Sequence, residues 1–138
     1  MATPNIEIMN AAALRILVKL CETTPLTVRL TPVSVMDDEM RRTYPDAANL
    51  EAVVNATIAR LHQRGYVEGN LVTSTPLNDP PAHQIPSATI SPSGRAAMER
   101  TTNAGPGNLY EEAHRAIANA DSRRIALFGQ LLSQAINL

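Results

Sequence analysis

The chain is poor in aromatic residues and in cysteine. Its 138 residues include no Trp, one Phe and three Tyr, so aromatics make up 3% of the chain while hydrophobic residues make up 44%. The core must therefore be aliphatic, which favours packed helices over a large sheet. The single cysteine, Cys21, stands in an apolar helical run and has no second thiol for an internal disulfide or a metal pair. We expect it to be a buried core residue.

An excess of either charge and a long apolar run are also missing. Twelve basic and 13 acidic residues give a formal net charge of −1, which argues against a polycation that coats nucleic acid nonspecifically. No apolar run approaches the roughly 18 residues of a membrane-spanning helix, and residues 1–5 lack the basic start and apolar block of a signal peptide. We expect a cytoplasmic protein of a bacterium or phage that does not enter a membrane.

Motifs of catalysis and of metal binding are absent. The sequence contains no HExxH, no CxxC, no phosphate-binding glycine loop and no nucleophile elbow. Three consecutive acidic residues begin at Asp37, but neighbouring side chains on a helix point about 100° apart and do not converge on one cation. The three histidines are far apart in the sequence: His62, His83 and His114. We therefore predict that the protein is not an enzyme and uses no metal or cofactor.

Apolar periodicity and capping residues predict several short elements in the first third of the chain. Thr3-Pro4 is a plausible helix start, and a first helix is expected from Pro4 or Asn10 to Glu22. A short strand follows at residues 27–30. A second helix is predicted from the Thr31 or Ser34 cap through Arg41, with residues 37–39 solvated in its first turns, where the helix dipole favours negative charge.

A third helix is predicted from about residue 49 to residue 64. Its apolar residues recur at steps of three and four, and Gly65 is placed to end it in a left-handed conformation. The predicted buried stripe is Leu50, Val53, Val54, Ile58 and Leu61. The opposite face carries Asn49, Glu51, Ala52, Asn55, Ala56, Ala59, Arg60 and Gln63.

The region from 69 to 87 is rich in turn residues and holds no Lys or Arg. Its prolines, at 76, 80, 81 and 86, predict an irregular loop with short strands only at its roots, near 66–68 and 88–90. Ser91-Pro92 repeats the cap-and-proline start and predicts a fourth helix to about Arg100.

The last part of the chain reads as a linker at 101–107 and a helical segment from 108 to 138. Asn108 and Glu111 have the spacing of a capping box. Asp121-Ser122 can divide the segment into two helices, whereas one unbroken helix would be about 45 Å long and would need a partner such as a second copy. The residues predicted to form a dimer contact are Ile117, Ile125, Leu127, Phe128, Leu131 and Leu132.

Two segments together resemble a known family. Residues 61–67 (LHQRGYV) read as a helix end entering a strand, and residues 90–95 (ISPSGR) as a strand entering a helix. In that order they resemble the winged helix-turn-helix of MarR- and PadR-type bacterial regulators. The resemblance implies a mainly α (α+β) winged helix-turn-helix domain over residues 1–103 with a small β-hairpin wing. Residues 104–138 would be a C-terminal helical extension that dimerises.

The resemblance further implies a homodimeric transcriptional regulator that inserts the helix at 49–64 into the major groove of double-stranded DNA. Amides can read base edges, small residues allow close approach, and arginines contact phosphates. The predicted DNA-binding residues are Arg41, Arg42, Asn49, Ala52, Asn55, Ala56 and Arg60. The family's wing usually has a basic tip, which residues 69–87 lack. The alternative is a winged-helix module that binds another protein and not DNA.

Overall fold

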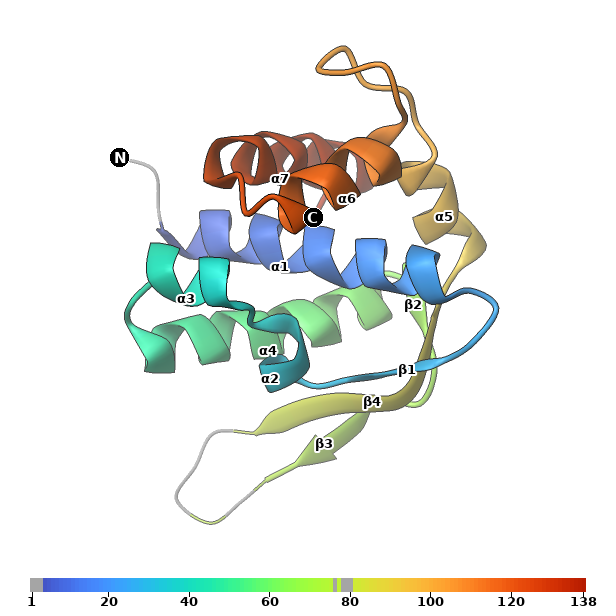
Figure 1. Cartoon of the computed structure of the whole chain (residues 1–138). Helices are drawn as coiled ribbons and strands as arrows, with labels where there is room; N and C mark the ends of the chain where they lie inside the picture. The colour runs from blue at the N-terminus through green and yellow to red at the C-terminus, as the bar shows by residue number, and fades with distance from the viewer. Residues whose placement is uncertain (1–3, 76, 78–80) are drawn as a thin grey trace.

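Figure 1 shows the computed structural model, which describes residues 4–75, 77 and 81–138. In these residues the chain forms seven helices and four strands, so it is a mixed α+β protein that is mainly helical. The first elements are α1 (Pro4–Thr23), β1 (Val28–Leu30), α2 (Pro32–Val35), α3 (Asp38–Thr43) and α4 (Ala47–Gln63). They are followed by β2 (Val67–Glu68), β3 (Val72–Ser74), β4 (Ala82–Ile90), α5 (Pro92–Met98), α6 (Leu109–Ala118) and α7 (Ser122–Ile136).

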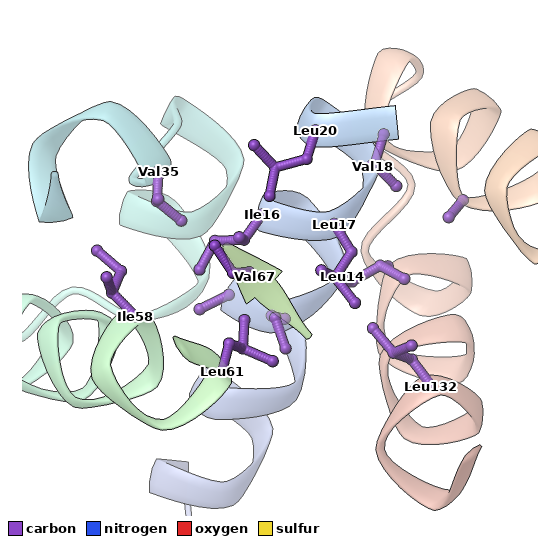
Figure 2. Packing of buried hydrophobic residues seen from close by; sticks show 14 of the residues in the cluster. Leu14, Ile16, Leu17, Val18, Leu20, Val35, Ile58, Leu61, Val67 and Leu132 are labelled. Carbon is purple, nitrogen blue, oxygen red and sulfur yellow. The ribbon is translucent and has the colours of Figure 1, made fainter. Parts of the chain in front are cut away.

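Helix α1 is the centre of the fold. It lies between α6 and α7 on one side and α3 and α4 on the other (Figure 1). Every residue from 11 to 18 is buried, and a helix that is covered on all sides belongs in the interior. Figure 2 shows Leu14 and Leu17 pointing into the same aliphatic cluster as Leu61 and Leu132. The predicted first helix is confirmed, although its proposed cap at Thr3 lies outside the described residues.

Cys21 packs against this cluster but is only half-buried. Burial raises the pKa of its thiol, and the nearby Arg95 guanidinium opposes that effect only in part. The expectation of a fully buried thiol was therefore too strong. In the described part of the chain, no helix is both long and apolar enough to cross a membrane.

The single helix predicted through Arg41 is two short helices, because Asp37 caps a new one. Its Oδ1 accepts a hydrogen bond from the backbone N–H of Met40 (2.9 Å), which begins α3. Of the three acidic residues predicted to be solvated, only Asp38 is exposed, because Asp37 and Glu39 contact α1. Arg15, itself 6% exposed, donates to Asp37 (2.7 Å) and to Glu39 (3.3 Å), and Glu39 is 8% exposed.

Helix α4 confirms the third predicted helix and begins slightly earlier. Asp46 caps its start by accepting from the backbone N–H of Asn49. Of the predicted stripe, Val53 is half-buried and the other members are buried: Leu50, Val54, Ile58 and Leu61. Gly65 has φ +80°, a conformation that side chains with a Cβ rarely adopt, so the predicted glycine stop is also confirmed.

Strand β4 is the central strand of a small antiparallel sheet. It pairs with β1, β2 and β3, with Val67 opposite Ile90 and Val72 opposite Gln84. The prediction of strands only at the loop roots was therefore wrong, because β4 extends from Ile90 back to Ala82. Pro86 is tolerated because the pairing with β1 shifts register beside it, and a proline needs no backbone donor at such an irregularity. Pro76 and Pro80 lie outside the described residues.

The two segments that carried the family resemblance meet at the start of α5. Ser91 caps the helix by accepting from Gly94 N (3.0 Å), and its own backbone N–H donates to the carbonyl of Tyr66 (3.2 Å). A Cβ at Gly94 would lie 2.5 Å from that carbonyl oxygen, so only glycine fits without a shift of the backbone. The predicted cap is confirmed, and α5 ends slightly before the predicted Arg100 at Met98.

The C-terminal segment is two helices that belong to the main core. Asp121 caps α7 and separates it from α6. Ile125, Phe128 and Leu132 are buried and join the same hydrophobic cluster as α1 and α4. Because these three side chains are buried by contacts within the chain, they are not available for the predicted dimer contact. The proposed division near residue 104 likewise falls between parts that share one core.

Candidate interaction surface on α4

Helix α4 presents one face to the core and the opposite face to solvent. Its exposed residues at steps of three and four form what we call the α4 ridge: Ala48, Ala52, Ala56, Arg60 and Gln63. Residues at this spacing lie in a row on one side of a helix. Ala52, Ala56 and Arg60, three of the predicted contact residues, are therefore brought together on an open surface.

The structure gives Asn55 a different task from the predicted one. Its Nδ2 donates to the carbonyl of Pro81 (2.8 Å), and its Oδ1 accepts from the backbone N–H of His83 (2.6 Å). The amide thus pairs in a bidentate way with the polypeptide at the start of β4. A side chain needs that same pair of groups to recognise adenine, so Asn55 positions the β3–β4 hairpin and is not free to read a base.

The side chain of Asn49 also makes a hydrogen bond within the chain. Its Nδ2 donates to Oδ1 of Asn5 at the start of α1 (2.9 Å), and its side chain is half-buried. This contact ties the first turn of α4 to the central helix. Both asparagines were predicted as readers of base edges, and their partners lie 26 to 44 residues away in the sequence, too far for a local pattern to show.

A second polar contact fixes the other end of the hairpin region to α4. Nε2 of His62 lies 2.8 Å from the carbonyl oxygen of Gly69. Because a carbonyl only accepts, Nε2 must carry the proton in this contact. Within the sheet, Arg29 donates to Gln84 (3.1 Å). The α4 ridge and the β3–β4 hairpin are therefore held as one surface by contacts at two separated points.

Exposed arginines near the ridge come from α3 and from the end of α4. Arg41 and Arg42 lie in the last turn of α3, Arg60 lies in the last turn of α4, and Arg64 at the C-cap of α4 donates to the carbonyl of Asn137. The start of α4 carries Asp46 and Glu51, both exposed. The potential along the ridge thus changes from negative at its first turn to positive at its last.

A cluster of charged side chains holds α3, and with it Arg41 and Arg42, in place. It consists of Arg15 on α1 with Asp37 and Glu39. Thr43 completes the cluster by donating to the second oxygen of Glu39 (3.1 Å). Burial alone would raise the pKa of the Asp37 carboxyl, but the hydrogen bonds from Arg15 and from Met40 N–H outweigh it and hold that pKa below its usual value. Asp37 is therefore ionised at neutral pH, and Arg15 keeps its partner.

In residues 4–75, 77 and 81–138, no three His, Cys, Asp or Glu side chains are close enough together to bind one metal ion. The three histidines remain apart: His62 and His83 contact the hairpin, and His114 lies 3.2 Å from Glu22. Comparison of the chain with protein-family models, with curated proteins and with solved structures finds no match.

Proposed function

We propose that the chain is a winged helix that binds double-stranded DNA through the α4 ridge and acts as a transcriptional regulator. Three features support the fold assignment. A strand (β1) follows the first helix, three helices follow that strand, and α4 leads directly into a hairpin whose second strand returns to pair with β1. The β3–β4 hairpin is then the wing, and α4 is the recognition helix.

The observation that carries the proposal is the exposure of the ridge. A helix enters the major groove, about 12 Å wide, only when one whole side of it is uncovered. The tail of the chain, α7, packs on α1 away from this side, so it leaves the ridge open. Ala52 and Ala56 are small enough to let the backbone approach the bases, and their methyl groups can contact thymine methyls.

The residue roles change from those predicted. Arg60 and Gln63 are the ridge side chains able to reach base edges, whereas Asn55 holds the wing. Arg41 and Arg42 provide phosphate contacts from α3. With two arginines placed to contact phosphates, we expect log K to fall with log salt concentration with a slope of about −2 for one chain. Such a slope predicts weak binding by a single chain.

Fluorescence anisotropy of a pool of random duplexes tests the proposal, with titrations at about 50 mM and about 200 mM salt. We expect retention at the lower salt and a large loss at the higher. Arg41→Ala should weaken binding and reduce the magnitude of the salt slope by about 1, whereas Arg60→Ala should weaken binding with little change in the slope. Arg95→Ala, which changes an exposed arginine on α5, is the control that should leave the slope unchanged. A chain that retains no duplex at low salt contradicts the proposal.

One observation favours a second candidate, a surface that docks another protein. Both polar atoms of the Asn55 amide make hydrogen bonds within the chain, and residues 69–87 contain no Lys or Arg. The ridge is then mostly a row of alanines, which suits close packing against another helix. The same titration separates the two candidates, because this one predicts no duplex retention at any salt concentration.

A further inference from the structure

Helix α7 and the segment that leads from α5 to α6 border a cavity of about 480 Å³, which we call the α7 cavity. It is lined by residues 100–104 and Leu109, and by four residues of α7: Leu127, Leu131, Gln134 and Ala135. Residues 127 to 135 of a helix span about 12 Å, so the wall that α7 contributes is elongated. None of the described residues that line the cavity belongs to α4 or to the β3–β4 hairpin, so it is separate from the α4 ridge.

The interior of the cavity is aliphatic. Leu109 is 4% exposed, and Leu131 is half-buried and packs against the core with part of its surface. Leu127 is 41% exposed beside them, and Ala135 adds a methyl group. Among the described lining residues none is aromatic. An exposed leucine is stabilised when an apolar ligand covers it, and a wall without rings offers contact to an aliphatic chain but no stacking surface to an aromatic ligand.

A positive charge stands at the edge of the cavity. Arg100 is exposed, and in residues 4–75, 77 and 81–138 no acidic side chain lies within ion-pair distance of it. The described lining contains no Asp or Glu, and its other polar residues are neutral, among them Thr101, Asn103 and Gln134. A guanidinium presents a planar fork of N–H donors that matches the two oxygens of a carboxylate. The described lining therefore combines an apolar surface with one cation that can bind an anion.

The segment that carries Arg100 is fixed by hydrogen bonds. The carbonyl of Arg100 accepts from the backbone N–H of Leu109 (2.8 Å), and Thr101 forms a β-bridge with Asn108. The carbonyl of Ala104 accepts from an arginine of α7 (3.0 Å). Because this wall is ordered before a ligand arrives, binding loses little conformational entropy in the protein.

We infer that the α7 cavity binds a straight-chain aliphatic carboxylate. The carboxylate pairs with the Arg100 guanidinium, and the chain lies along α7 over Leu127 and Leu131. A volume of about 480 Å³ is within the range of small-molecule sites. One cation matches the single charge of a carboxylate, whereas a phosphate monoester carries more than one charge at neutral pH. The elongated aliphatic wall suits a chain better than a compact ring.

Titration of the full chain with sodium octanoate below its micelle-forming concentration, followed by the NMR shifts of the backbone amides, tests the inference and requires no DNA. We expect saturable shifts confined to residues 100–104, 109 and 127–135. Hexanoate lacks two methylenes and should bind about tenfold more weakly. Octanamide has the same chain length and no charge. It should also bind about tenfold more weakly, because the hydrogen bonds between two charged groups are lost.

Two pairs of variants separate the role of the charge from that of the apolar contact. Arg100→Gln should weaken octanoate binding about tenfold and leave octanamide binding unchanged. Arg95→Gln, at an exposed arginine outside the described lining, should change neither. Leu127→Asn should weaken the binding of both compounds about tenfold, whereas Leu26→Asn, at a leucine that is 73% exposed elsewhere, should weaken neither. Thermal unfolding of the four variants shows whether each one is folded.

Octanoate that shifts no amide of the α7 cavity overturns the inference, as does equal affinity for octanoate and octanamide. Shifts that spread over the exposed leucines of the whole chain and persist in Leu127→Asn would show surface adsorption of an amphiphile, and would overturn it as well. None of these outcomes bears on the α4 ridge, since the ridge shares no described residue with the cavity.

Discussion

Oδ1 of Asn55 lies 2.6 Å from the backbone nitrogen of His83, so one side chain of α4 holds the first residues of β4. Its Nδ2 makes the second contact by donating to the carbonyl of Pro81. The surface that we propose binds DNA thus consists of a helix and a hairpin joined by a side chain that was predicted to contact DNA. The spacing of the hairpin from the ridge depends on this amide.

Asn55→Ala should loosen the hairpin. The variant leaves the half-buried N–H of His83 without its acceptor, so we expect a loss of about 1–2 kcal/mol in the free energy of unfolding. Hydrogen exchange of the backbone amides at 82–84 should become faster. Asn55→Asp keeps the acceptor for His83 N but puts a carboxylate oxygen against the carbonyl of Pro81, so it tests the two contacts separately. Unchanged hydrogen exchange in Asn55→Ala would show that the two hydrogen bonds of Asn55 do not hold the hairpin in solution.

The Arg15–Asp37 pair should make the free energy of unfolding decrease as the pH is lowered. The folded-state pKa of Asp37 is below its unfolded value of about 3.9, so the carboxylate stabilises the fold fully above that value. This contribution disappears as pH falls through the lower, folded pKa. Asp37→Asn keeps a capping side chain but removes the charge. The stability difference between wild type and variant, measured by urea unfolding, should be constant near neutral pH and shrink in acid. A constant difference at all pH values contradicts this account.

Two adjacent glutamates allow a matched test of the contacts that hold residues 104–107. Glu112 is 1% exposed and accepts from Gly107 N and from Arg124, which also donates to the carbonyl of Ala104. Glu112→Gln weakens these charged hydrogen bonds in a buried site and should cost about 2 kcal/mol of unfolding free energy. Glu111→Gln should cost almost nothing, because glutamine serves equally in a capping box with Asn108. Equal losses in the two variants would mean that Glu112 does not hold residues 104–107.

Features set by neighbouring residues were predicted correctly from the sequence. The cap at Ser91, the capping box of Asn108 with Glu111 and the left-handed Gly65 each depend on residues within a few positions. These signals placed α4, α5 and α6 with small errors at their ends.

Features set by distant partners could not be predicted in this way. The pairing of the acidic first turn of α3 depends on Arg15, which lies 22 residues before Asp37. The role of Asn55 depends on the path of β4, and periodicity alone cannot show which apolar stripe of α7 the core takes. The sequence has both stripes, and only the packing on α1 assigns Phe128 to the interior and Leu127 to the surface.

The most direct measurement of the central claim compares two alanine-to-glutamate variants in a duplex-binding titration. Ala56→Glu puts a carboxylate in the middle of the α4 ridge, and Ala96→Glu puts one at an exposed position of α5. Both should fold as the wild type does, because both methyl groups face solvent. We predict that Ala56→Glu abolishes duplex binding while Ala96→Glu preserves it. Equal binding by the two variants would contradict a DNA-binding surface on α4.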